Sequence, residues 1–160
     1  MNVISEIIQE HTSQNETNTQ ALAATLSVKV IPGDCILLIG DLGSGKTTFA
    51  RSVITTLNKD ITNVPSPTYT LLQTYPILTD QGEGCLAHVD LYRLEHVSEL
   101  EELGLDEYLN DGITLIEWPE IARHQLPANN LTITFECLPN GDRLIQYYGN
   151  TDWKKRIDNT

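Results

Sequence analysis

Apolar and polar residues follow two different patterns along this chain, and each pattern predicts one type of secondary-structure element. Residues 17–30 place apolar side chains four residues apart, as on one buried face of a helix; these are Leu22, Leu26 and Val30. The run CILLI (35–39) is apolar without interruption, and ITLI (113–116) is apolar apart from Thr114. Uninterrupted apolar strands are typical of parallel sheets that helices cover on both faces. The pattern therefore predicts an α/β fold.

The remaining segments alternate between β-rich and helical patterns. We expect further strands over residues 3–11, 65–76, 85–92, 131–139 and 143–149, and helices over residues 47–57 and 98–110. The polar stretch 77–84 predicts a long hairpin loop. Gly104 is predicted to end a helix, and Pro119 is predicted to begin another helix. Residues 151–160 fit either a helix or a frayed tail. These elements predict a three-layer α/β/α sandwich with a mixed, partly parallel central sheet.

The length of the chain limits what this sheet can be combined with. The 160 residues suffice for one domain with a core of its own, spanning 1–160. They leave no room for a second, substrate-binding domain. We therefore expect one domain to carry the whole site.

The stretch LLIGDLGSGKTTFAR, residues 37–51, carries the strongest chemical signal. It matches the phosphate-binding P-loop pattern G-x-x-x-x-G-K-[ST], between a predicted strand and a predicted helix. Glycines let successive backbone N–H groups turn inward around an anion, and the positive end of the next helix adds to the attraction. Lys46 is predicted to reach the β- and γ-phosphates of a nucleotide, and the Thr47 hydroxyl to join the shell of a Mg²⁺ ion. The alternative is a glycine-rich turn that binds nothing.

This loop predicts that the fold is of the P-loop NTPase type. Its expected contacts to the nucleotide come from consecutive residues, namely Asp41, Leu42, Gly43, Ser44, Gly45, Lys46, Thr47 and Thr48.

Two acidic residues end predicted strands where the ligand crevice of a parallel sheet lies. Asp90 ends the run CLAHVD and is a candidate Walker-B aspartate that holds Mg²⁺. Glu117 ends the run ITLIE and is a candidate to orient or deprotonate an attacking water. With Thr47, these carboxylates form the predicted metal-binding set. The alternative for each acid is an ordinary strand end, and Trp118 beside Glu117 fits simple packing equally well.

The segment PSPTYT raises a further possibility. Pro65 and Pro67 stiffen an extended segment and would keep the hydroxyls of Ser66 and Thr68 exposed. Such hydroxyls could contact a ligand, as in a loop that senses the γ-phosphate of a nucleotide. The alternative is an edge strand that begins at the prolines. The four histidines share no metal-binding spacing, but His88 lies two residues before Asp90 and so on the same side of a strand. His88 is therefore either a residue that supports the site or an ordinary residue of the core.

Charge and composition narrow the choice of partners. The chain has 10 basic and 22 acidic residues and a net charge of −12, which is unfavourable for binding nucleic-acid phosphates directly. If RNA is involved, we expect another protein to hold it. Three cysteines without a C-x-x-C spacing suggest reduced thiols in the core, and no apolar run is long enough for a membrane span. We expect a cytoplasmic protein that binds neither membrane nor DNA.

The segments GDLGSGKTTFAR, SPTYTLLQTY, HVDLYRL and LIEWPE, in this order, closely resemble the bacterial TsaE family of ATPases for tRNA threonylcarbamoyladenosine biosynthesis. The resemblance implies a small ATPase that binds ATP or ADP with Mg²⁺. It implies action with the TsaB–TsaD pair, and with TsaC upstream, to place a threonylcarbamoyl group on the adenosine next to the anticodon. The tRNAs concerned read codons that begin with adenosine, and the chain would contact them only through its partners.

The resemblance also assigns roles by position. Lys46 would be the P-loop lysine, Thr47 the metal-facing threonine, Thr68 a switch-like threonine and Asp90 the Walker-B aspartate, while Glu117 and Trp118 would lie near the nucleotide. Ser44 and Tyr69 stand where alanine and phenylalanine are frequent, and the extension after Trp153 matches no motif.

Two other functions are compatible with a P-loop. A small-molecule kinase needs an acceptor pocket and an arginine-bearing lid, and the chain has no long insertion to form that lid. A nucleotide-bound switch or scaffold with negligible turnover is harder to separate from an ATPase. Guanine selectivity has no support, because NKDI at residues 58–61 does not match N-K-x-D and the D-x-x-G pattern is absent.

Overall fold

The structure is a computed structural model and describes residues 5–159, so Val3 and Ile4 of the predicted first strand and Thr160 lie outside it. Within residues 5–159, seven strands form one sheet. Their bounds are Glu6–Ser13 (β1), Cys35–Gly40 (β2), Leu72–Thr79 (β3), Gly82–Asp90 (β4), Ile113–Glu117 (β5), Leu131–Cys137 (β6) and Arg143–Gly149 (β7). The helices are Glu16–Ser27 (α1), Lys46–Leu57 (α2), Leu100–Leu103 (α3), Leu105–Asp111 (α4) and Thr151–Asp158 (α5), with 3₁₀ turns at Val97–Glu99 (η1) and Pro119–Gln125 (η2).

The sheet is mixed, as predicted, with the parallel strands at its centre. The strand order is β1-β7-β6-β2-β5-β4-β3, and β2 pairs in parallel with both β5 and β6 while β4 pairs in parallel with β5. The outer strands β1, β7 and β3 pair antiparallel with their neighbours. Because β2, β4 and β5 run in the same direction, their carboxyl ends meet at one edge of the sheet, where Asp90 and Glu117 are direct neighbours.

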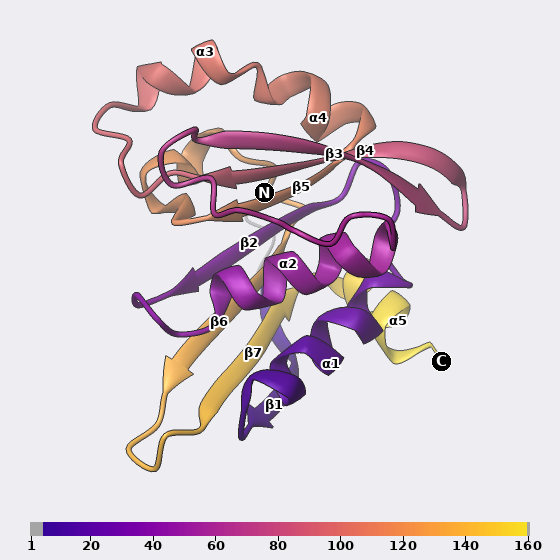
Figure 1. Ribbon diagram of the computed structural model, residues 1–160, viewed down its shortest axis with the longest axis vertical. Coiled ribbons are helices and arrows are strands. Elements are labelled where there is room, and N and C mark those ends of the chain that lie inside the picture. The colour runs from indigo at the N-terminus through magenta and orange to yellow at the C-terminus, as the bar shows by residue number, and fades with distance from the viewer. Residues whose placement is uncertain (1–4, 160) are drawn as a thin grey trace.

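Helices cover both faces of the sheet, and each face has its own core. On one face, α1, α2 and α5 bury Leu26, Phe49 and Trp153 against the sheet. On the other, α3, α4 and η2 bury Leu100, Leu105 and other apolar residues. Figure 1 shows α1 and α2 side by side and well separated from α3 and α4. None of the helices within the described residues has both the length and the apolar character that crossing a bilayer requires.

Several local predictions are wrong. The segment 77–84 is not a long loop, because β3 and β4 join through a tight turn at residues 80–81, with Gly82 at a φ of 107°. Residues 65–71 are irregular backbone and turns rather than strand, so β3 begins only at Leu72. Gly104 does end α3, yet α4 starts directly after it. The core assignment of the cysteines holds for Cys35 but not for Cys137, which is exposed.

One outer edge of the sheet is formed by β3, which contains a proline. Pro76 lies opposite Cys85 of β4. The side-chain amide of Asn58, at the end of α2, donates to the Pro76 carbonyl at 2.7 Å. This carbonyl therefore faces the end of α2.

Residues 151–158 form a helix rather than a frayed tail. Trp153 is 1% exposed, and Arg156 donates two hydrogen bonds of 2.8 Å to Asp34 while its guanidinium lies 4.0 Å from the centroid of the Trp153 ring. Packing and charge pairing together hold α5 against the body of the protein.

The first turn of α5 depends on Asn150. Its Oδ1 accepts from the Trp153 N–H at 3.0 Å, and its Nδ2 donates to Asn129 Oδ1 at 2.7 Å. Replacing Asn150 with Ala should lower the free energy of unfolding by about 1 kcal/mol, because the cap is lost. Chemical denaturation measures this, with exposed Thr151→Ala as the control. An unchanged midpoint for Asn150→Ala would show that α5 docks without its cap.

Candidate functional site

The glycine-rich loop connects β2 to α2 at the carboxyl edge of the sheet. A Cβ at Gly40 would come within 2.6 Å of both Phe135 O and Ser44 Oγ, so the loop closes here only around a glycine. Gly45 has a φ of 108°, which also favours glycine, and α2 begins at the next residue without a side-chain cap. The first N–H groups of α2 are therefore left for other acceptors. Ser44 Oγ is buried and has no partner within residues 5–159.

Lys46 is only 5% exposed, although it carries an amino group. Its Nζ donates to the carbonyls of Gly40 and Asp41, the latter at 3.0 Å, and lies 4.0 Å from the centroid of the Trp118 ring. Burial lowers the pKa of Lys46, and nearby carboxylates, first among them Glu117, oppose that shift. The amino group is thus held at the mouth of the loop by weak acceptors that a phosphate could replace.

Glu117 connects the loop to the centre of the sheet. Its Oε1 accepts from the Thr47 hydroxyl at 2.7 Å, and its Oε2 lies 2.6 Å from His88 Nε2. The side chain is 1% exposed, and this burial would raise its pKa. The hydrogen bond and charge of His88, the Thr47 bond and the charge of Lys46 outweigh burial, so the pKa of Glu117 lies below its usual value. Glu117 is therefore a carboxylate at neutral pH.

Asp90 lies beside Glu117 and faces the segment 65–71. Its Oδ2 accepts from the Thr68 hydroxyl at 2.9 Å, and its Oδ1 accepts from the Tyr92 N–H at 2.9 Å. Thr68 Oγ1 lies 2.8 Å from Ser66 Oγ. Thr68 therefore adjoins the predicted metal site from a different segment of the chain.

Trp118 adopts an unusual backbone conformation between Glu117 and Pro119. Its φ is 56°, in the left-handed region that a bulky side chain rarely occupies. Its ring packs on Tyr92, with centroids 4.9 Å apart, while Lys46 approaches it as well. The sharp turn after β5 thus places an aromatic surface directly beside the loop lysine.

The predicted magnesium set was Thr47, Asp90 and Glu117. All three offer hard oxygen ligands: Thr47, in the first turn of α2, donates to Glu117, and Asp90 lies opposite Glu117 in the sheet. Among the residues that the structure describes, no three His, Cys, Asp or Glu side chains gather as a metal-binding group. Mg²⁺ is commonly held by one or two carboxylates together with substrate phosphates and water. The residues present therefore fit a magnesium ion that arrives with a nucleotide rather than one caged by protein alone.

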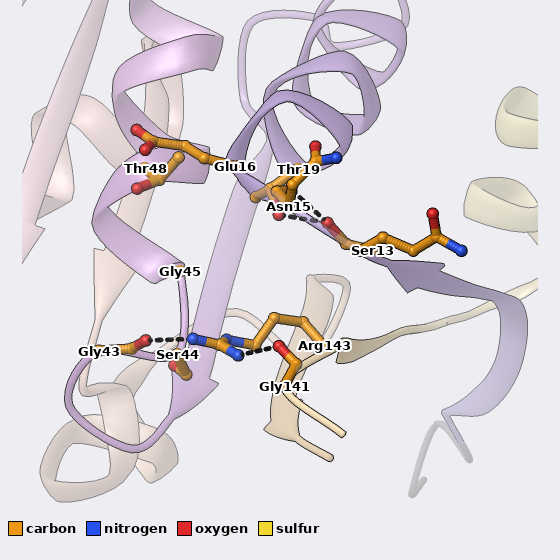
Figure 2. A pocket seen from close by; sticks show the side chains of 11 residues that line it. Ser13, Asn15, Glu16, Thr19, Gly43, Ser44, Gly45, Thr48, Gly141 and Arg143 are labelled. Carbon is orange, nitrogen blue, oxygen red and sulfur yellow. Dashed lines mark hydrogen bonds between the residues drawn. The ribbon is translucent and has the colours of Figure 1, made fainter. Parts of the chain in front are cut away.

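A pocket of about 250 Å³ opens between the glycine-rich loop, the β1–α1 junction and the start of β7, as Figure 2 shows. Arg143, at the start of β7, reaches across it and donates to the carbonyl of Gly43 at 3.2 Å and of Gly141 at 2.7 Å. The β1–α1 junction forms another wall, where Ser13 and Thr19 hydrogen-bond at 2.7 Å. The remaining lining residues are Gln14, Asn15, Glu16, Ser44, Gly45 and Thr48.

Comparison with known proteins identifies the family to which this chain belongs. The family model described as "Threonylcarbamoyl adenosine biosynthesis protein TsaE" matches residues 13–145. The chain belongs to the TsaE family. The "tRNA threonylcarbamoyladenosine biosynthesis protein TsaE" of Rickettsia felis is 40% identical over 144 residues, 90% of this chain and 82% of the relative. The protein of the same name from Bacillus subtilis is 38% identical, over 83% of this chain and 80% of its own length. The crystal structure of Bacillus subtilis YdiB matches with a TM-score of 0.76 and 29% identity, covering 96% of this chain and 93% of that one.

In this TsaE-family protein, the predicted site residues are brought together around the start of α2. Lys46, Thr47, Glu117 and Trp118 are linked by direct contacts, while Asp90 and Thr68 form a second pair next to them. Leu42 is different, because it lies at the tip of the loop and is 70% exposed. Thr48 lines the pocket shown in Figure 2.

Several other residues that lie beside the loop or Trp118 were not predicted from the sequence. Arg143 and Ser13 approach the loop only through the pairing of β1 with β7, and no motif in the chain marks them. Tyr92, which packs on Trp118, was read only as the end of a strand. Its position two residues after Asp90 was the available signal.

Proposed function

We propose that this TsaE-family protein is a Mg²⁺-dependent P-loop ATPase required for threonylcarbamoylation of the adenosine next to the anticodon in tRNAs that read ANN codons. The names of its relatives supply the pathway. The observation that carries the enzymatic part is the direct contact between the loop threonine and a buried carboxylate, Thr47 to Glu117 at 2.7 Å. An anion-binding loop without catalysis needs no such carboxylate.

Each residue of the site has a proposed task at the phosphates. Lys46 would exchange its carbonyl partners for oxygens of the β- and γ-phosphates, and the free N–H groups at the start of α2 would complete the cradle. Thr47 and Asp90 would ligate Mg²⁺, which neutralises charge on the phosphates when bound. Glu117 would orient the attacking water and accept its proton. Thr68, tied to Asp90, would respond to the presence of the γ-phosphate.

We propose that the nucleoside of ATP or ADP occupies the pocket in Figure 2. The pocket adjoins the loop through Ser44, Gly45 and Thr48, and neither Asp90 nor Glu117 is among its lining residues. A nucleotide whose phosphates lie in the loop can therefore extend into it. Trp118 would instead remain on the γ-phosphate side, next to Lys46.

Arg143 would support this binding by holding the loop. Replacing Arg143 with Met should raise the Kd for ADP with Mg²⁺ by about threefold to tenfold, because one hydrogen bond to the loop backbone is worth about 0.5–1.5 kcal/mol. Isothermal titration calorimetry measures the change. Arg123→Met, which changes an exposed residue of η2, is the matched control. Equal affinities of wild type and Arg143→Met would separate Arg143 from nucleotide binding.

Partners follow from the family and from the charge. With a net charge of −12, the chain is a poor ligand for tRNA by itself. We propose that it acts in the cytoplasm with the TsaB–TsaD pair, which holds the tRNA, and that hydrolysis supports the modification cycle rather than performing the transfer.

The test is hydrolysis of ATP by the purified protein with Mg²⁺, alone and with TsaB and TsaD. We expect the pair to raise the rate, and GTP to be a poorer substrate. Transfer of phosphate to one of a panel of small acceptors, without an effect of the pair, would identify a kinase. Binding of ATP with no turnover under any condition would identify a switch or scaffold.

A further inference from the structure

A buried histidine lies behind the site and takes no part in the function proposed above. His88 is on β4, two residues before Asp90, and is 0% exposed. It lies opposite Leu115 of β5 in the sheet. An imidazole in such surroundings has lost its water and needs a specific partner.

That partner is Glu117 alone within residues 5–159. His88 Nε2 lies 2.6 Å from Glu117 Oε2, whereas Nδ1 is buried and has no hydrogen-bond partner among the described residues. Glu117 in turn accepts from Thr47 at the start of α2, so the histidine contacts the candidate site through this one carboxylate. This arrangement points to a role directed at Glu117.

The two oxygens of Glu117 are held from opposite ends. Thr47 donates to Oε1 at 2.7 Å, and His88 occupies Oε2. With both bonds made, the carboxylate cannot rotate about its last bond without breaking one of them. If Mg²⁺ draws the Thr47 hydroxyl away, the histidine bond is the one that still fixes the carboxylate.

We propose that His88 is a positioning residue for ATP hydrolysis, whose Nε2–H holds Glu117 Oε2 so that the other oxygen stays directed at the start of α2. This inference rests on the proposed ATPase function. His88 is fully buried, so it would act only through Glu117.

The sharpest test compares two amides of different reach. Glutamine can place an N–H near the position of imidazole Nε2, whereas the shorter asparagine reaches only the position of Nδ1. We expect His88→Asn to lower kcat for ATP at least tenfold with KM unchanged within twofold, and His88→Gln to stay within threefold of wild type. Thr114→Val, on β5, removes a buried hydroxyl that has no hydrogen-bond partner among the described residues, and should leave kcat unchanged.

A double-mutant cycle separates positioning from a general structural role. In a Glu117→Gln background, His88→Asn should lower kcat by less than a further twofold, because the residue through which it acts is already removed. The same tenfold loss in both backgrounds would overturn the proposal. So would equal losses for His88→Asn and His88→Gln.

A second readout needs no turnover. Nitrogen-15 NMR of the ligand-free protein, with His88→Gln to assign the signals, should show a proton on Nε2 of His88. An unprotonated Nε2 would overturn the inference.

The kinetic results distinguish failure of this inference from failure of the proposed function. If wild type hydrolyses ATP and Glu117→Gln is slow, but His88→Asn is as fast as wild type, then only the inference fails. If wild type does not hydrolyse ATP even with TsaB and TsaD, the proposed function fails and the inference with it.

Discussion

Replacing Lys46 with Ala should raise the Kd for ATP with Mg²⁺ by at least about 100-fold, because charge-assisted hydrogen bonds are worth about 1.5–3 kcal/mol each. The wild-type amino group is already buried at the mouth of the loop, 3.0 Å from the Asp41 carbonyl. In the free protein the amino group has only weak carbonyl acceptors, so replacing them with phosphate oxygens costs little free energy. Isothermal titration calorimetry with ATP measures the loss directly.

The control for Lys46 is Lys59, which is exposed and follows α2 at its far end. Lys59→Ala removes the same charge and should leave the Kd within twofold. Thermal unfolding of both variants checks that the fold is intact. Tight ATP binding by folded Lys46→Ala would refute the assignment of residues 40–47 as a P-loop.

Replacing Glu117 with Ala should lower kcat for ATP by about 100-fold or more, the usual range for removing a group that handles the proton of the attacking water. ATP affinity should change by no more than threefold, because Glu117 is not expected to contact the nucleotide. Glu117→Gln should behave in the same way, since it keeps the shape but not the charge. Single-turnover hydrolysis and calorimetry separate the two effects.

Glu120 is the matched control for Glu117. It is exposed on η2 and also lies near enough to influence the pKa of Lys46, so Glu120→Ala tests a loss of negative charge without loss of the buried carboxylate. Its kcat should remain within threefold of wild type. If Glu117→Ala hydrolyses ATP at the wild-type rate, the water-orienting role belongs to another residue.

The centre of the site could be predicted because it depends on local rules. Parallel strands end at the same edge of a sheet, so two strand-end acids, Asp90 and Glu117, had to lie near each other once β4 and β5 were recognised. Alternation along β4 placed His88 on the side of Asp90 by the same logic. That Asp90 and Glu117 are direct neighbours depends in addition on the pairing of β4 with β5.

The rest depends on pairings between distant segments. Arg143 meets the loop a hundred residues away only because β7 lies between β1 and β6. The turn at residues 80–81 was obscured by the glycines of residues 77–84, which suggested a loop although Gly84 lies within β4. Burial likewise separated Cys35 from exposed Cys137, which no spacing in the sequence distinguishes. The extent of the domain stays a prediction.

The proline in β3 has a consequence for solubility. An open sheet edge can recruit a strand from another molecule through its free N–H and carbonyl groups, which is a common start of aggregation. At Pro76 the N–H is absent and the carbonyl is already bound to Asn58, so neither group is available there. A strand from another molecule could not form backbone hydrogen bonds with Pro76, in the middle of β3. This interrupts the growth of intermolecular sheets.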